Sequence, residues 1–158
     1  FIDSEISLYD YIFEIVRSYR ELSSKKFIIN SEEFENRVNT HKSSEIIYGL
    51  RNFIGNANKF SFKKIKIFLK SDNKKTELII LDDGPGFPKD LINTHKLGEP
   101  YIRSAQKSHI SKYGLGLGTF IGKTLLEKNF ADIKFINSKT TGGAEVQIKW
   151  KNKYLIKI

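Results

Sequence analysis

Two glycine-rich stretches, each adjoining an apolar segment, constrain this chain more than any other feature. The first, residues 82–86 (DDGPG), follows the apolar run at 76–81, and the second, 114–118 (GLGLG), leads into an apolar helical segment. A third stretch, residues 52–61 (NFIGNANKFS), precedes both and carries apolar residues at helical spacing. Glycines let a backbone approach a bound group closely, and N–H groups at a helix start favour phosphate. The order of the three stretches predicts one composite binding site.

Each stretch offers a group that ATP requires. Asn56 presents an amide oxygen from a helix, and Mg2+ prefers oxygen ligands. Asp82 only accepts hydrogen bonds when ionised, which suits the adenine amino group. The glycines of 114–118 free backbone N–H groups for phosphates at the start of a helix. The residues therefore predict ATP and Mg2+ as ligands.

The three stretches resemble the N, G1 and G2 boxes of the GHKL ATPase superfamily, and specifically the catalytic and ATP-binding (HATPase_c) domain of sensor histidine kinases. The likeness covers about residues 43–150. Residues 97–104 (LGEPYIRS) stand where those kinases carry an F box. Together with residues 114–127, this segment is similar to the RegB/PrrB type of redox-responsive sensor kinase. The chain contains no cysteine, so it carries no redox-active thiol.

The resemblance implies a specific set of site residues. Asn56 is the expected metal ligand, Asp82 the adenine acceptor, and Lys59 and Arg103 the cations near the phosphates. Asn52 and Lys59 are candidates for a catalytic role. The full expected ATP site comprises Asn52, Asn56, Lys59, Phe60, Asp82, Gly84, Gly86, Arg103, Gly114, Leu115, Gly116, Leu117 and Gly118.

The fold class implied by the resemblance is an α/β (α+β) two-layer sandwich, the Bergerat fold, with a mixed, mostly antiparallel sheet. Three helices cover one face, and a flexible lid closes over ATP. Periodicity predicts helices over 6–22, 43–60 (N-capped by Ser43 or Ser44) and 119–128. It predicts strands over 27–29, 65–69, 76–81, 133–137 and 144–150, an edge strand over 154–158, and polar connections over 31–42 and 88–113.

The 158 residues are expected to form a single catalytic and ATP-binding domain. Residues 1–25 are expected to lead, as an N-terminal helix, from a dimerisation domain missing from this chain. Residues 96–113 are the ATP lid that the resemblance implies, since this long polar segment lies between the two glycine-rich stretches, where histidine kinases have their lid. The chain begins at Phe1 and has no Met, so it reads as a fragment.

The implied activity is transfer of the γ-phosphoryl group of ATP to a histidine on that dimerisation domain. His41, His95 and His109 lack the sequence context of the acceptor. The implied partners are the dimerisation domain and a response regulator, with a homodimer in the full-length protein and a monomeric fragment. The implied location is the cytoplasmic domain of a bacterial sensor kinase anchored in the inner membrane.

Other functions remain open. A gyrase/Hsp90-like ATPase is one alternative, which Asn52 disfavours. Gyrase-like and MutL-like ATPases carry a water-activating Glu four residues before the metal Asn, and here that position is Asn52. A serine kinase of the anti-sigma type and a degenerate nucleotide-binding module are further alternatives. A nucleic-acid binder would suit the net charge of +9, but the lysines are scattered and form no single stripe, so no nucleic acid is expected.

Two departures from the kinase motifs concern the lid and the adenine. The F box lacks its paired phenylalanines, and Pro100 and Tyr101 occupy part of it. The late Gly-x-Gly-Thr motif reads TGGA at residues 141–144, so its hydroxyl is missing and water or Thr141 is the expected substitute. Asp83, next to the adenine acceptor, is expected to be a solvated turn residue.

Overall fold

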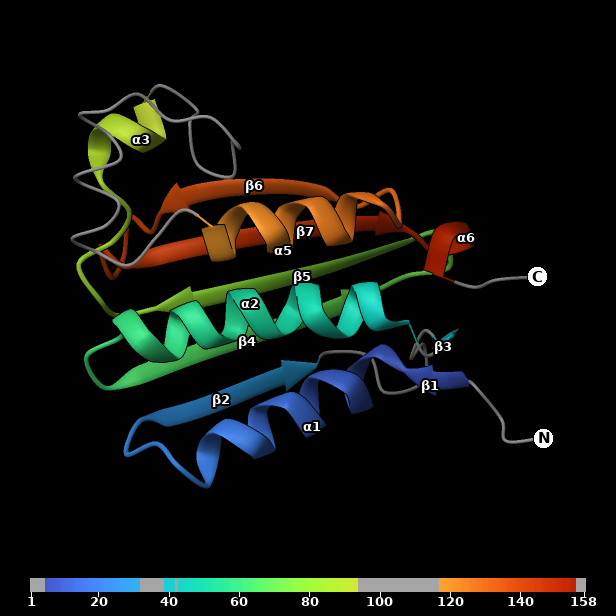
Figure 1. Cartoon of the computed structure of the whole chain (residues 1–158), viewed down its shortest axis with the longest axis horizontal. Coiled ribbons are helices and arrows are strands. Elements are labelled where there is room, and N and C mark those ends of the chain that lie inside the picture. The colour runs from blue at the N-terminus through green and yellow to red at the C-terminus, as the bar shows by residue number, and fades with distance from the viewer. Residues whose placement is uncertain (1–4, 32–38, 42, 94–116, 156–158) are drawn as a thin grey trace.

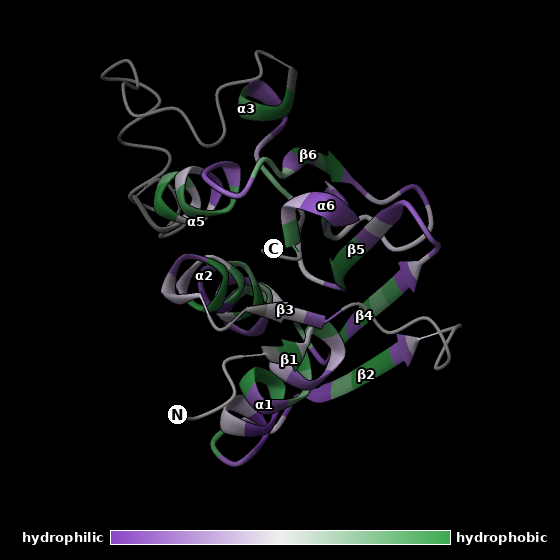
Figure 2. Cartoon of the chain, turned by 90° about the vertical axis from the view of Figure 1, so that its right-hand side faces the viewer, coloured by the Kyte–Doolittle hydropathy of each residue, from purple (hydrophilic) through white to green (hydrophobic). Residues whose placement is uncertain are grey.

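A computed structural model of the chain describes residues 5–31, 39–41, 43–93 and 117–155. It has two layers: a five-stranded sheet, and three helices that all cover the same face of that sheet (Figures 1 and 2). The expected fold class is confirmed. The covering helices are α1 (Leu8–Arg20), α2 (Ser44–Phe60) and α5 (Leu117–Glu127). The sheet consists of β2 (Lys26–Ser31), β4 (Lys64–Ser71), β5 (Lys75–Asp82), β6 (Asp132–Asn137) and β7 (Ala144–Lys151).

The strand order is β2-β4-β5-β7-β6, in which β2 and β4 are parallel and every other pair is antiparallel. The strands predicted over 65–69 and 76–81 are present as β4 and β5, which pair antiparallel. Residues alternate between the helix-covered face and the open face, as in any half-buried sheet. One register row shows the result: Ile67 pairs with Ile80, and Ile80 pairs with Val146, all three buried under the helices. Burying each such side chain stabilises the fold by about 1.5–3 kcal/mol.

Serine residues are the N-caps of α1 and α2. The Ser7 hydroxyl accepts a hydrogen bond from the Asp10 N–H at 3.1 Å, and the Ser43 hydroxyl accepts one from the Ile46 N–H at 3.4 Å. Such caps satisfy N–H groups that have no partner within the helix. The predicted N-cap at Ser43 is therefore confirmed. The Ser43 N–H also donates to the Tyr11 hydroxyl at 2.8 Å, which joins α1 to the start of α2.

Two short elements near the N-terminus were not expected. β1 (Glu5–Ser7) pairs antiparallel with β3 (Asn39–His41), forming a separate two-stranded sheet. The helix α1 that follows β1 buries Leu8, Ile12 and Val16 in the main core. Within the described residues, α1 is thus an integral part of the domain.

The edge strand expected over 154–158 is wrong for its described part, because Asn152–Leu155 forms a short helix, α6. Asn152 forms hydrogen bonds at the β4–β5 turn, and these redirect the chain after β7. Its N–H donates to the Lys74 carbonyl, its Nδ2 to the Asp72 carbonyl, and its Oδ1 accepts from the Thr76 hydroxyl.

The expected loop over 88–113 begins with a short helix, α3 (Lys89–Asn93). The predicted lid, residues 96–113, lies outside the described residues and stays a prediction. In the part of the chain that the structure describes, no helix combines the length and hydrophobicity that crossing a bilayer requires.

Candidate functional site

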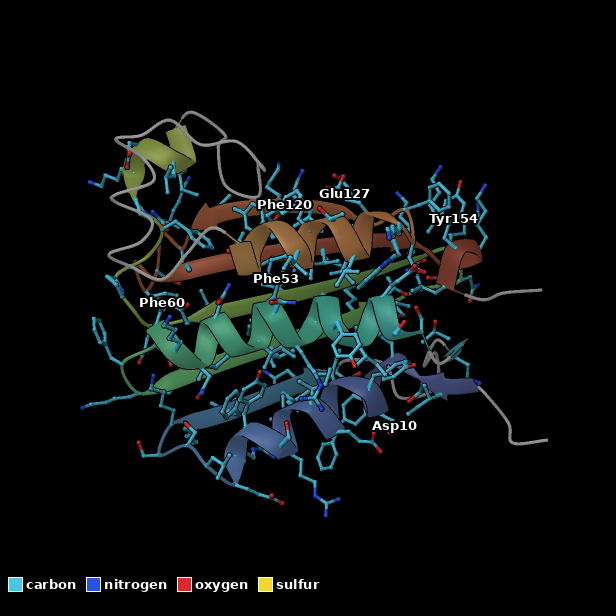
Figure 3. All side chains as sticks on the ribbon, in the orientation of Figure 1. Asp10, Phe53, Phe60, Phe120, Glu127 and Tyr154 are labelled. Atoms are coloured by element: carbon cyan, nitrogen blue, oxygen red, sulfur yellow. The ribbon has the colours of Figure 1, made fainter. Side chains whose placement is uncertain are left out.

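A small cavity lies between α2, α5 and the sheet, near the carboxyl end of β5. It holds about 30 Å3, room for about two waters, so a purine would need its walls to move apart. Phe53 and Phe60, which Figure 3 labels on α2, both line it. The cavity is mainly apolar, with lining residues Phe53, Asn56, Ala57, Phe60, Ile80, Asp82, Pro85, Gly86, Phe87, Thr119, Phe135, Ala144 and Val146.

Asp82 ends β5 and places a carboxylate in this cavity with only 5% of its surface exposed. Its Oδ1 accepts hydrogen bonds from the Gly84 N–H at 2.8 Å and the Ala144 N–H at 3.1 Å. Among the described residues, no hydrogen bond engages its Oδ2. Burial raises the pKa of Asp82, while the two backbone hydrogen bonds oppose that increase. One oxygen is thus fixed by the backbone, and the other remains available to a ligand.

The β6–β7 turn approaches Asp82 very closely. A Cβ atom on Gly143 would lie 1.9 Å from the Asp82 carbonyl oxygen, so no larger residue fits there. The Thr141 hydroxyl, 3.3 Å from the same carbonyl, donates to it and accepts from the Gly143 N–H. The Thr141 hydroxyl, one of the two expected substitutes near the adenine, therefore serves the turn, and Thr141 does not line the cavity.

Asn137 holds the glycine loop that follows Asp82. Its Nδ2 donates to the Phe87 carbonyl at 3.0 Å, and its Oδ1 accepts from the Phe87 N–H at 2.7 Å. Gly86, in the same loop, lines the cavity with a φ of 82°, which glycine adopts without strain. The Asn137 side chain thus pairs with the backbone of Phe87 as a neighbouring strand would, and it fixes this wall of the cavity.

Asn56 enters the cavity from α2 and is half-buried. Its Nδ2 donates to the hydroxyl of Thr119 at 3.3 Å, across the gap between α2 and α5. Thr119 is 1% exposed and also lines the cavity. This hydrogen bond leaves the Oδ1 of Asn56 as the atom that can act as a ligand.

Two expected residues of α2 do not line the cavity. Asn52, one turn before Asn56, donates its Nδ2 to the Tyr48 carbonyl at 2.7 Å. Lys59 is exposed, and its Nζ lies 5.3 Å from the centroid of the Phe60 ring. Because Phe60 is a lining residue, Lys59 stands next to the cavity wall rather than in it.

Part of the expected site falls in other regions. Gly84 is buried and contributes the N–H that binds Asp82. Leu117 and Gly118 are the first two residues of α5. Arg103, Gly114, Leu115 and Gly116 lie outside the described residues, so their roles stay predictions.

Asp83 lies in a partly exposed turn, as expected, and its carboxylate also binds the backbone. Its Oδ1 accepts from the N–H groups of Phe62 and Lys63, at 2.8 and 3.1 Å, in the turn between α2 and β4. Partial burial works against its charge, but hydrogen bonds from Lys63, Lys64 and Phe62 outweigh that effect and lower the pKa of Asp83. Of the two adjacent carboxylates, Asp82 faces the cavity and Asp83 holds the backbone.

Sequence reasoning missed Thr119, Asn137 and the N–H of Ala144. A hydroxyl within the apolar segment 117–127 was the available signal for Thr119. No pattern identifies Asn137, whose partner is a backbone 50 residues away. The role of Ala144 belongs to its main chain, which side-chain motifs do not report.

Comparison with known proteins agrees with this geometry. A family model described as "Histidine kinase-, DNA gyrase B-, and HSP90-like ATPase" matches residues 41–153. The sensor histidine kinase RegB of Cereibacter sphaeroides is 36% identical over 99 residues, covering 60% of this chain and 21% of that protein. The chain thus spans about a fifth of the length of this curated relative.

Solved structures share the fold at lower identity. The catalytic domain of histidine kinase ThkA has a TM-score of 0.75 at 21% identity, covering 97% of each chain. ThkA in complex with the response regulator protein TrrA has a TM-score of 0.71 at 19% identity, covering 95% of this chain and 42% of that chain. The family model spans more than half of the chain, which therefore belongs to the family of histidine kinase-, DNA gyrase B- and HSP90-like ATPases.

Proposed function

We propose that this chain is the catalytic and ATP-binding domain of a two-component sensor histidine kinase. Membership of an ATPase family implies nucleotide binding, and the likeness to RegB favours the kinase branch. The observation that carries the proposal is the convergence of Asn56 and Asp82 on one apolar cavity, from α2 and from the end of β5. These two residues come from the two predicted motifs that the structure describes in full.

Adenine is the part of ATP that this cavity suits. The free Oδ2 of Asp82 accepts from the exocyclic amino group, while the Gly84 and Ala144 N–H groups hold Oδ1 in place. Apolar side chains from both layers, including Phe60 and Phe135, surround the base. A buried acceptor left without a donor is costly, so a base without an amino group is disfavoured.

Mg2+ suits the oxygen ligand that Asn56, among the described residues, offers at the cavity. The Oδ1 of Asn56 is an uncharged oxygen, and Mg2+ usually takes few protein ligands together with phosphate oxygens and waters. Among the described residues, no cluster of His, Asp or Glu forms a competing metal site. When bound, the ion neutralises charge on the phosphates. Lys59, at the cavity wall, and Arg103 supply further positive charge, and the backbone of Gly114, Gly116 and Gly118 completes the phosphate site with Leu115 and Leu117 beside it.

The lining of the cavity favours transfer to a protein over hydrolysis. Of the described lining residues, Asp82 is the only carboxylate, and two backbone N–H groups hold it in place. At position 52, where hydrolytic relatives carry Glu, an amide donates to a backbone carbonyl. A site without a base to activate water retains ATP for another acceptor, and positioning supplies most of the catalysis.

The acceptor and partners follow from the same proposal. The phosphoryl group passes to a histidine on a dimerisation domain, which forms a homodimer in the full-length protein, and then to a response regulator. The complex of ThkA with TrrA supports such a partner for a protein of this fold. The proposed location is the cytoplasmic side of a bacterial membrane-anchored kinase.

The test combines the chain with γ-labelled ATP, Mg2+ and the dimerisation domain of its own full-length protein. We expect acid-labile label on the acceptor histidine and negligible phosphate release from the chain alone. Rapid phosphate release without an acceptor would instead assign the chain to the gyrase or Hsp90 branch. Acid-stable label on a supplied protein would indicate a serine kinase, and nucleotide binding without transfer would indicate a degenerate module.

A further inference from the structure

A second depression lies at the opposite end of β5 from Asp82. This end groove has a volume of about 490 Å3, far larger than the cavity at Asp82. Figure 3 places Tyr154 on α6 at this end and Phe60 at the other. Its aromatic lining residues are Phe130, Trp150 and Tyr154, and its basic ones are Lys75, Lys149 and Lys151.

Phe130 holds a backbone conformation that costs free energy. It follows α5 with a φ of 61°, and it is the only non-glycine residue with positive φ among those the structure describes. A helix usually places glycine at such a position, because a Cβ crowds the backbone there. The ring is 67% exposed, so core packing does not explain why a large side chain is kept. Strain of this kind at an exposed residue points to binding.

The aromatic residues form one surface. The rings of Phe130 and Tyr154 lie 4.5 Å apart at an interplanar angle of 34°, and Tyr154 is 37% exposed. Trp150 lines the same groove, and its buried Nε1 has no hydrogen-bond partner among the described residues. The indole is only 2% exposed, so the aromatic surface that a ligand can contact consists of Phe130 and Tyr154.

The charge around the end groove selects the partner. A hollow of about 350 Å3 adjoins it and adds Lys74 and Lys153, so five lysines surround the two depressions. Among the described residues, only two carboxylates, Glu77 and Asp132, line them, and both are register partners of Lys149. The excess of lysine favours an acidic partner, whereas the two carboxylates disfavour a continuous phosphate backbone.

We propose that the end groove binds an acidic peptide segment of a partner protein, which places one apolar side chain against the Phe130–Tyr154 ring pair. The lysines attract the acidic residues of the peptide. This site goes beyond the proposed kinase function and does not depend on it, since it shares no residue with the cavity at Asp82.

Trp150 allows a direct test, because it is the only tryptophan in the chain. The probes are short synthetic peptides of Asp and Glu around one Phe or Leu, each matched by a peptide with Lys in place of the acids. We expect the acidic peptides to shift Trp150 emission saturably, at micromolar concentrations that rise with added salt. The lysine peptides should not bind.

Two variants, each with a matched control, locate the binding. Phe130→Gly should weaken binding of labelled peptide at least about fivefold while keeping the Tm or raising it by up to about 4 °C. Its control is Phe62→Gly, which removes a ring of equal exposure far from the groove. Lys151→Glu should weaken binding, whereas Lys26→Glu, the same charge change on β2, should not.

The results that would overturn the proposal are equally specific. The first is the absence of saturable binding of any acidic peptide up to about 1 mM. The second is an equal loss of peptide affinity in Phe62→Gly and Phe130→Gly. The third is a lowered Tm with unchanged peptide affinity in Phe130→Gly. The last result would make the ring pair purely structural. Tighter binding of single-stranded DNA than of any peptide, lost in Phe130→Gly, would assign the groove to nucleic acid instead.

Discussion

The side chain of Asn56 donates a hydrogen bond to the hydroxyl of Thr119, 3.3 Å away and 63 residues later in the sequence. The bond joins α2 to α5 at the cavity wall. The side-chain amide of Asn56 could turn either its NH2 group or its oxygen toward Thr119. In this hydrogen bond the NH2 group faces Thr119. Thr119 therefore orients the oxygen that we propose as the Mg2+ ligand, without binding the metal itself.

Thr119→Val keeps the shape of the side chain and removes the acceptor for Asn56. We expect ATP affinity in the presence of Mg2+ to fall by about 1 kcal/mol, because the amide is no longer held in one orientation. Affinity measured with EDTA should stay unchanged. Thr119→Ser should restore binding, and Thr124→Val, at an exposed position of α5, is the control. Equal losses with and without Mg2+ would show that Thr119 shapes the cavity and does not orient Asn56.

Asp82→Asn should weaken ATP, ADP and AMP together, by about 1–3 kcal/mol. The variant amide still accepts from the Gly84 and Ala144 N–H groups through its oxygen, so the fold is kept. The NH2 group of the variant takes the position of Oδ2. Because it donates and does not accept, it cannot bind the adenine amino group as Oδ2 does. Calorimetric titration of the three nucleotides measures the effect. An unchanged ADP affinity in the folded variant would remove Asp82 from the site.

The same variant has a predicted effect on stability. Burial raises the pKa of Asp82 in the folded state, so the protonated form is favoured there. The stability linked to this proton is present below the unfolded pKa of about 3.9 and is lost as pH rises through the raised folded pKa. Asp82→Asn, which carries no charge, should therefore have a Tm advantage over the wild type that grows with pH. A constant difference from pH 4 to pH 8 would contradict this account.

Asp83 should show the opposite pH dependence. Its pKa is lowered in the folded state, so its stabilisation is present above the ordinary Asp pKa and is lost as pH falls through the folded value. Asp83→Ala leaves the Phe62 and Lys63 N–H groups without their acceptor, and we expect a loss of about 1 kcal/mol at pH 7. That loss should shrink in acid. Asp132→Ala, at an exposed carboxylate on β6, is the control for thermal unfolding.

The sequence predicted the local parts of the site and missed the long-range ones. Asn56 and Asp82 could be found because each follows from a motif and from the period of its own helix or strand. Asn137 and Thr119 act through partners 50 and 63 residues away, and no local pattern records such pairs. The edge strand predicted over 154–158 is wrong in its described part for the same reason, since Asn152 bonds to Asp72, 80 residues earlier. Lys59 was placed correctly on its helix, but the exposed position of its side chain depends on tertiary packing.

Gly143→Ala tests how closely the β6–β7 turn must approach Asp82. The added Cβ would lie 1.9 Å from the Asp82 carbonyl oxygen, which belongs to the backbone and cannot turn away. We expect a destabilisation of about 1–3 kcal/mol and a loss of nucleotide binding, because the Ala144 N–H moves away from Oδ1. Gly142→Ala is the matched control, since a Cβ there meets no atom within 4 Å, although its φ of 75° adds a smaller strain. Equal effects of the two changes would attribute the loss to backbone strain alone.

Asn52→Glu distinguishes a kinase site from a hydrolytic one. Asn52 lies one turn before Asn56, where hydrolytic relatives carry a glutamate, and its amide now donates to the Tyr48 carbonyl. A carboxylate cannot make that bond, so the Glu side chain is free to reorient. A positioned general base contributes about 10²–10⁴-fold to such reactions. We therefore expect phosphate release at saturating ATP to rise at least about tenfold over the negligible wild-type rate.

The control is Asn52→Gln, which has the same length as Glu but no basicity and should leave the rate of phosphate release unchanged. Repulsion between the new carboxylate and the phosphates should weaken ATP binding, so affinity is measured separately by calorimetry. If Asn52→Glu binds ATP and still releases no phosphate, position 52 is not where water attacks, and the absence of a base there would no longer explain retention of ATP.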